Sequence, residues 1–382
     1  FRRRWVNYSP AMTSCYLCTI ILEKLAVLVS CQIWKERFVV NVIYSPLLRH
    51  SNAEMNAFSG LKQSSKSRLL PIIEGKRISR RSKEKWNKQL NSAGNFLYER
   101  IGTSKFIYAF KNVFDNLQDH STEIKIEDKN PVEFLLEKFK DHNLNYIPCF
   151  DHDSPAWLIK NLLNDKSEEI AVRIRYHDLS ETIHTLINNH VKNVISQFNN
   201  KHIYLIHDYK NSIKEEIIER NLKEFSFSKS ISIILLLSTL DTNKDVAPMS
   251  FQKISDNNEF SIFKRFSTKF PRIIYSDYTT RLTPEPDTKA GFNINNSYLK
   301  LIYTTPNGYY LGKSEMYKYG EPENFQTLCK NLADSSIYMG EHFSLADKQI
   351  LDISRRLIEV TTHQQTIELS INHHIEYIVS IL

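Results

Sequence analysis

Residues 272–280 read RIIYSDYTT, an apolar run that ends on an aspartate–tyrosine pair and leads into a polar, proline-containing loop at 281–287. A buried parallel strand that ends at a ligand-facing surface has this form, because its faces are covered while its carboxyl end opens toward solvent. The same form recurs along the chain, where a β-rich run stops at an acid, a base or a hydroxyl and a helical pattern follows. The chain is therefore expected to alternate strands and helices.

We expect eight β-rich runs to form the strands of this repeat. They cover residues 69–74, 106–110, 145–150, 171–176, 203–206, 231–237, 272–280 and 298–304. A further short run at 41–48 contains a proline and is not counted among them. Alternating units with long crossovers imply parallel strands, and eight such units are the number of a TIM barrel.

An open doubly wound sheet is the alternative to the barrel. Such a sheet usually carries a glycine-rich phosphate loop after its first strand, and Glu74-Gly75-Lys76 has no such pattern. We therefore predict an α/β fold of the TIM-barrel-like (β/α)8 type, with closing helices at 343–358 and 373–382.

Cap residues predict where several helices begin. Asn130-Pro131-Val132-Glu133 is a strong helix start, and Ser154-Pro155 is expected to cap the next helix in the same manner. Ser180 is expected to start a long helix with one apolar face. That face would consist of Ile183, Leu186, Ile187, His190, Val191, Val194, Ile195 and Phe198. His190 would then be a boundary histidine.

Residues 1–40 differ from the rest of the chain. A triple arginine at 2–4 precedes an apolar run at 15–34 that Glu23 and Lys24 interrupt, so no membrane span is expected there. We interpret this part as a leader that is disordered or not native, with a peripheral amphipathic helix as the alternative. Residues 41–382 are predicted to form a single barrel-like domain. The five cysteines are scattered and odd in number, which favours a reducing, cytoplasmic setting.

The net charge of +7 permits an anionic partner without requiring one. Residues 76–88 concentrate seven of the basic side chains: Lys76, Arg77, Arg80, Arg81, Lys83, Lys85 and Lys88. A nucleic-acid contact at this stretch is the less favoured interpretation, because Trp86 alone supplies an aromatic ring for stacking. A solvated helix start is favoured.

The candidate site follows from the barrel, because active sites of such folds gather at the carboxyl ends of the strands. Glu74, Asp208 and Asp277 stand at three of these ends and are the candidate acid–base groups or metal ligands. The candidate ligand-binding residues are Arg173, Arg175, His177, Tyr278 and His373. The two arginines share one face of a strand and would hold an anion. An internal network of ion pairs is the competing interpretation, and neither a metal nor a cofactor is specified.

Six short motifs resemble the beta family proteins, which are named after a phage beta protein. They are Tyr44-Ser45-Pro46-Leu47-Leu48-Arg49 with Glu54 and Ala57, Leu70-Pro71-Ile72-Ile73-Glu74, Arg173-Ile174-Arg175, Asp277-Tyr278, Phe343-Ser344 with Asp347, and Asn372-His373-His374-Ile375-Glu376-Tyr377. Their order and spacing carry the resemblance, which runs from about residue 41 to the end. It implies a bacterial or phage-borne intracellular protein of mobile-element or defence-type context, and it implies no particular reaction.

The chain departs from the family pattern at two places. The family usually has a lysine shortly before its first Glu, where His50 or Ser51 stands here. It also tends to carry a Thr-Thr-Trp-Arg run before its Asn-His-His, where this chain reads Gln364-Gln365-Thr366-Ile367, so residues 356–370 are also open to local corruption of the sequence.

Together these features predict a barrel protein that binds an anionic, nucleotide- or phosphate-like small molecule at the carboxyl-end mouth. The alternative is a non-catalytic interaction module that contacts a protein or nucleic acid through its loops and the basic stretch at 76–88.

Overall fold

A computed structural model describes residues 42–78, 83–114, 125–198, 201–225, 230–241, 244–281, 297–316, 323–360 and 362–382. Its residues from Ile43 to Leu382 form one compact unit. The predicted leader at 1–40 lies outside the described residues. So do residues 79–82 of the basic stretch, together with the side chains of 83–85.

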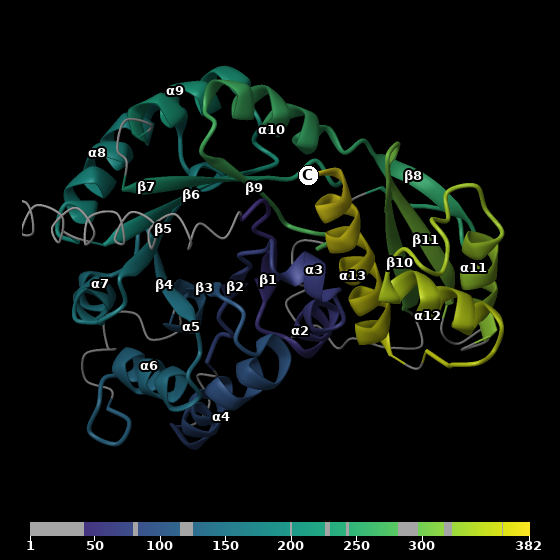
Figure 1. Ribbon diagram of the computed structural model, residues 1–382, viewed down its shortest axis with the longest axis horizontal. Coiled ribbons are helices and arrows are strands. Elements are labelled where there is room, and N and C mark those ends of the chain that lie inside the picture. The colour runs from purple at the N-terminus through teal and green to yellow at the C-terminus, as the bar shows by residue number, and fades with distance from the viewer. Residues whose placement is uncertain are drawn as a thin grey trace, which may run out of the picture. The chain divides into compact units, whose positions relative to one another are not determined.

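Eight parallel strands form one sheet, which confirms the predicted α/β barrel-like fold (Figure 1). In sheet order they are β1 (Leu47–Arg49), β2 (Ile72–Glu74), β3 (Phe106–Ala109), β4 (Tyr146–Asp151), β5 (Glu169–Arg175), β6 (His202–Lys210), β7 (Ile231–Leu237) and β9 (Ile273–Asp277). The sheet nearly closes on itself. Tyr44 forms a parallel bridge with Tyr275, and the Ser45 N–H donates to the Tyr275 carbonyl at 2.8 Å.

Helices follow the strands and cover the outside of this sheet. They are α2 (Asn52–Ser59), α3 (Gln63–Lys66), α4 (Lys83–Ile101), α5 (Lys111–Phe114), α6 (Pro131–Asp141), α7 (Ala156–Leu163), α8 (His184–Ile195), α9 (Glu215–Phe225) and α10 (Asn258–Lys269). Aliphatic and aromatic side chains fill the layer between sheet and helices; Phe106 and Tyr108 of β3, for example, pack edge-on against Phe139 of α6. Because side chains alternate along a strand, the opposite face of each strand points into the barrel.

A three-stranded antiparallel sheet corrects the predicted position of the eighth strand. It consists of β10 (Tyr298–Thr305), β11 (Gly308–Met316) and β8 (Phe251–Ser255), in that order. The run at 298–304 is therefore no barrel strand, and β1, which had not been counted, belongs to the barrel. Only Pro306 and Asn307 separate β10 from β11, and so short a turn can join only antiparallel neighbours.

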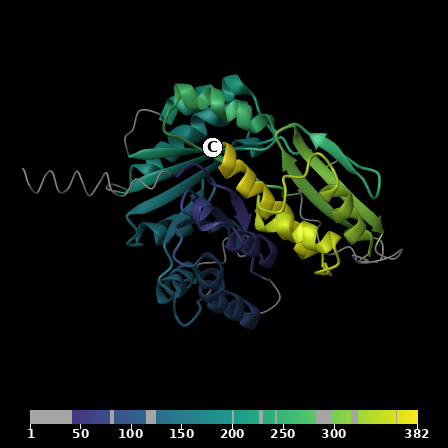
Figure 2. The same cartoon turned by 45° about the vertical axis from the view of Figure 1, so that its right-hand side comes forward.

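Three helices end the chain: α11 (Glu323–Ala333), α12 (Leu345–Ser354) and α13 (His363–Ile381). In both views α13 lies between the parallel sheet and the three-stranded sheet (Figures 1 and 2). Asn372 of α13 donates to the Ala57 carbonyl of α2 at 2.9 Å, and Ser370 accepts from the Ile302 N–H of β10 at 3.0 Å. The closing helix thus joins the two sheets. No helix within the described ranges is long and apolar enough to cross a membrane.

Two of the three predicted helix starts need correction. Asn130 caps α6 as expected, because its side chain accepts from the Val132 N–H at 2.9 Å. Ser154 does not cap α7; its hydroxyl accepts from the Asp151 N–H at 2.9 Å, and α7 begins after Pro155 without a side-chain cap. Ser180 leads into a 3-10 turn at Glu181–Ile183, and α8 begins only at His184.

The predicted apolar face of α8 is confirmed only in part: Val191 and Val194 are buried, and Ile187 and Ile195 pack against the core. The buried residues are His184, Asn188, Val191 and Val194, whereas Leu186 is 68% exposed. His190 is also exposed, so its predicted place at the edge of an apolar face is wrong.

Candidate functional site

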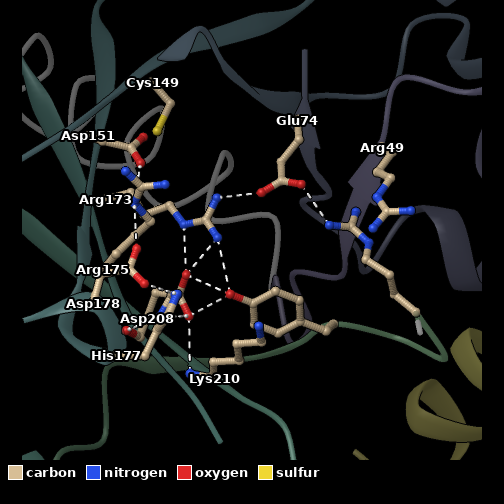
Figure 3. Close-up of polar contacts among 12 residues, drawn as sticks. Arg49, Glu74, Cys149, Asp151, Arg173, Arg175, His177, Asp178, Asp208 and Lys210 are labelled. Carbon is tan, nitrogen blue, oxygen red and sulfur yellow. Dashed lines mark hydrogen bonds and ion pairs between the residues drawn. The ribbon is translucent and has the colours of Figure 1, made fainter. Parts of the chain in front are cut away.

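A buried arginine stands at the centre of the strand ends. The Arg173 guanidinium lies between the carboxylates of Glu74 and Asp208, as Figure 3 shows. It donates to Glu74 Oε1 at 2.7 Å and, through two nitrogens, to Asp208 Oδ2 at 2.9 and 2.6 Å. Strands β2, β5 and β6 thus join their carboxyl ends through one side chain, which brings three predicted site residues together.

Tyr278 and His177 extend this network, as the sequence predicted that they would line the same mouth. The Tyr278 hydroxyl donates to Asp208 at 2.8 Å and accepts from Arg173 at 3.2 Å. His177 Nδ1 lies 3.4 Å from Asp208 Oδ1. Asp208 also accepts from the Lys210 N–H at 3.1 Å, so its carboxylate is surrounded by donors.

Arg281 and Glu54 complete the network, although neither was among the predicted site residues. Arg281 donates to Glu74 at 2.6 Å and to Glu54 at 3.3 Å, and Glu54 accepts from the Arg49 N–H at 2.6 Å. The signal for Arg281 in the sequence is its place in the loop directly after the Asp277-Tyr278 strand end. Nothing in the spacing indicates that it folds back over the barrel.

The arginines keep the central carboxylates ionised. Burial by itself would raise the pKa of Glu74, but the charges of Arg281 and Arg173 outweigh it and lower this pKa to about 2. Burial opposes ionisation of Asp208 as well, and Arg173 together with His177 still holds its pKa well below the usual range. The central network is therefore a set of mutually compensating buried ions, which is costly to break on one side only.

Arg175 lies in a different environment, although it shares a strand with Arg173. Its side chain is 20% exposed and is surrounded by three aspartates. The distances from its guanidinium nitrogens are 3.1 Å to Asp151, 3.2 Å to Asp153 and 3.6 Å to Asp178. The two arginines predicted to act as one clamp are thus held by separate sets of carboxylates.

Lys111, at the start of α5, pairs with the same Asp153 that Arg175 contacts. The Asp153 side chain is 45% exposed, whereas Lys111 is 15% exposed. Two mostly buried cations therefore share one half-exposed carboxylate at the ends of β3 and β5. Sequence reasoning missed Lys111, because only the fold brings it next to the end of β4.

Asp151 differs electrostatically from Glu74 and Asp208 at the same mouth. It is 2% exposed, and its Oδ1 has no hydrogen-bond partner among the described atoms. Burial raises the pKa of Asp151 to about 8, against a smaller opposing effect of Arg173. Arg175 Nε is 3.1 Å from Asp151 Oδ2, yet its N–H is not aimed at this oxygen and makes no hydrogen bond. Burial thus favours the protonated form of Asp151, whose buried Oδ1 has no hydrogen-bond partner among the described atoms.

Asp277 lies on the opposite face of β9 from Tyr278 and outside this network. It accepts from the Tyr44 hydroxyl at 2.6 Å and contacts His374 Nε2 at 3.1 Å. His374 Nδ1 in turn lies 2.9 Å from the Thr304 hydroxyl of β10. The predicted acid–base residue thus forms part of a buried chain that connects β9, α13 and β10.

His373 takes a similar place one residue earlier. Its Nδ1 lies 2.8 Å from Asp347, its Nε2 lies 2.8 Å from the Thr304 carbonyl, and its ring stacks on Tyr303 with centroids 3.8 Å apart. His373 and Asp347 are fully buried. In this structure the predicted ligand-binding histidine joins α12 and α13 to β10.

No group of three His, Cys, Asp or Glu side chains in the described part of the chain is arranged to hold a metal ion. A family model described as "Beta protein" matches residues 44–380. A search of curated proteins found no match.

Proposed function

Since this chain belongs to the Beta protein family and carries two cations that share one half-exposed carboxylate, we propose that its barrel mouth binds a phosphate-like anionic small molecule. Arg175 and Lys111 hold the anion. Asp151 donates its proton, in a hydrogen bond, to a neutral oxygen of the same ligand.

The exposure of Asp153 is the observation that carries this proposal. An ion pair with a half-exposed carboxylate contributes only about 0–1 kcal/mol, so a ligand anion can replace Asp153 at little cost. Two oxygens of a phosphate group match a guanidinium and an ammonium at this position. Asp153 in this view occupies the place of the ligand when none is bound.

Arg173 has a different part in the proposal from the one predicted from the sequence. Its donors already meet Glu74, Asp208 and Tyr278; Asp208 and Tyr278 are buried, and the Glu74 side chain is 13% exposed. Displacing a buried carboxylate would leave a charge unpaired, which costs about 3–5 kcal/mol. Arg173, Glu74 and Asp208 therefore hold the mouth rigid, and Arg175 is the arginine that the ligand contacts.

Two substitutions with opposite expected effects test the anion site. Arg175→Gln removes a charged donor and should weaken binding of inorganic phosphate about tenfold or more, measured by calorimetry. Asp153→Ala removes the competing carboxylate and should tighten binding about two- to fivefold. The opposite signs matter, because general damage to the fold would weaken binding in both variants.

The controls make the same charge changes on exposed surface elsewhere. Arg220→Gln on α9 and Asp334→Ala after α11 should leave the affinity within about twofold of the wild type. Weaker binding in Asp153→Ala, or no effect of Arg175→Gln, would contradict the proposed site.

A further inference from the structure

A cavity of about 420 Å³ lies outside the barrel, between the amino end of α2 and the face of α4. Its volume falls within the usual range of small-molecule sites. The residues that matter for its chemistry are His50, Asn52, Lys76, Gln89, Phe96 and Arg100. None of them belongs to the network around Arg173 or to the proposed site at Arg175.

The charge of this cavity is positive. Lys76 and Arg100 both line it. Burial, together with the charges of Lys76 and Arg100, lowers the pKa of His50 to about 3. Glu99 is the acid in the lining; it is 57% exposed and lies 3.3 Å from Arg100. No ion pair joins Lys76 to an acid within the described part of the chain.

The walls of the cavity are fixed by contacts among the lining residues. The His50 ring stacks on Phe96 with centroids 4.7 Å apart, and its Nδ1 lies 3.2 Å from the Tyr108 hydroxyl. Arg100 lies 4.1 Å from the Phe96 ring centre and donates to Asn52 at 3.4 Å. Gln89 donates to the Lys76 carbonyl at 3.0 Å, which ties the end of β2 to α4. The fold thus brings His50, Lys76 and Arg100 to the wall of one cavity.

We infer that this cavity is a second anion site, which takes the phosphate group of a phosphorylated small molecule between Lys76, Arg100 and His50. The reason is that Lys76 and Arg100 together oppose a third positive charge on His50, and a bound dianion would replace that opposition with attraction. The bound anion would also favour the protonated imidazole, so binding would be coupled to proton uptake by His50. Lys76 and Arg100 are cationic side chains, Glu99 faces Arg100, and Tyr108 stays neutral, so His50 is the lining group whose protonation a bound anion would change.

Calorimetry with inorganic phosphate and with ribose 5-phosphate tests this site on the full chain. Lys76→Gln should weaken binding about three- to tenfold, since Lys76 is exposed and its removal leaves no buried charge behind. Lys88→Gln is the matched control, because Lys88 is an exposed lysine of α4 that does not line the cavity. It should bind within about twofold of the wild type.

Proton uptake gives a second readout that a merely structural role would not produce. At about pH 6, the apparent binding enthalpy in two buffers of different ionisation enthalpy should reveal uptake by the wild type. His50→Gln should abolish that uptake while some binding remains. Equal uptake in the wild type and His50→Gln would overturn the assignment of His50.

The arms of the experiment also separate this cavity from other anion sites. Anion binding that survives Lys76→Gln but is lost in Arg175→Gln would overturn the inferred cavity site and support the mouth alone. Loss in Lys76→Gln with no effect of Arg175→Gln would support the cavity and contradict the mouth. Saturable binding of a short single-stranded oligonucleotide, with none of either phosphate compound, would overturn the small-molecule site in favour of a nucleic-acid contact.

Discussion

Two aspartates at the ends of β4 and β6, the two strands that flank β5, differ in charge state. Asp208 meets the guanidinium of Arg173 directly and is ionised, because that contact outweighs its burial. Asp151 is equally buried, but one of its oxygens has no partner and its pKa is raised to about 8. The difference arises from the direction in which each arginine points. Position at a strand end alone would predict the same charge state for both acids.

The stability of Asp151→Asn should show whether the wild-type carboxyl group is protonated or ionised in the folded protein. A folded pKa above the unfolded value of 3.8 means that stability is complete below that value and declines as the pH rises toward 8. The neutral amide avoids this decline. Relative to the wild type, the free energy of unfolding of the variant should therefore rise by roughly 1 kcal/mol per pH unit between about pH 5 and 8, as measured in urea unfolding series.

Asp208→Asn is the contrasting variant. It removes the charge that faces buried Arg173 and should lower the free energy of unfolding by about 3 kcal/mol at neutral pH. Equal losses in the two variants would contradict the assigned charge states. A stable Asp151→Asn protein that no longer binds phosphate would mark Asp151 as a group kept for ligand binding at the expense of stability.

Residue identities at strand ends could be predicted from the sequence, but their partners could not. Glu74, Asp208, Arg173 and Tyr278 were expected at one mouth, and contacts join all four. Asp277 was expected at the same mouth because it stands at the carboxyl end of a barrel strand. Alternation along β9 instead turns the Asp277 and Tyr278 side chains to opposite faces.

At the scale of elements, α13 and β10 hold the two sheets together through buried histidines. Thr304 of β10 contacts both: its hydroxyl lies 2.9 Å from His374, and its carbonyl lies 2.8 Å from His373. Each histidine then reaches an aspartate, Asp277 of β9 or Asp347 of α12. The closing helix is thereby tied to three different elements by polar contacts within the core.

Asp277→Asn should separate a structural from a ligand-binding role for this chain of contacts. The amide retains the shape but loses the charge-assisted contacts to Tyr44 and His374. We expect a loss of about 1.5–3 kcal/mol in the free energy of unfolding, with phosphate affinity unchanged. Asp334→Asn, at an exposed position, is the control for the charge change. A normal unfolding midpoint together with weaker phosphate binding would instead show that Asp277 belongs to the ligand site.

Local signals misplaced the helix starts at Ser154 and Ser180, but in other places they predicted an element correctly. The Asn130-Pro131 start of α6 is such a case, because capping involves adjacent residues only. The number of barrel strands depends on long-range pairing. β1 is only three residues long and follows a proline, and β10 has the apolar pattern of a barrel strand. Periodicity alone could not show that the two should exchange places.

At the scale of the whole molecule, buried neutral histidines make the fold sensitive to acid. His207 is fully buried, neither ring nitrogen has a partner among the described atoms, and burial lowers its pKa to about 3. His50 is lowered to about 3 as well. Because the unfolded chain binds these protons near pH 6.5 and the folded protein does not, stability is retained above that pH and lost below it.

Replacing His207 by phenylalanine should reduce this acid sensitivity. The side chain lies among the rings of Tyr176, Tyr209 and Phe225, so an aromatic ring of similar size fits the site. Urea unfolding should be measured at a series of pH values from about 6 to 4. The free energy of unfolding of the variant should fall less steeply than that of the wild type, by about 1.4 kcal/mol per pH unit. His342→Gln should follow the wild-type curve, because His342 is almost fully exposed. If His207→Phe declines as steeply as the wild type, then His207 takes up its proton in the folded state. The decline in stability between pH 6 and 4 would then belong to other buried histidines such as His50, because the stabilising contribution of Glu74 is lost only as the pH falls below about 4.5.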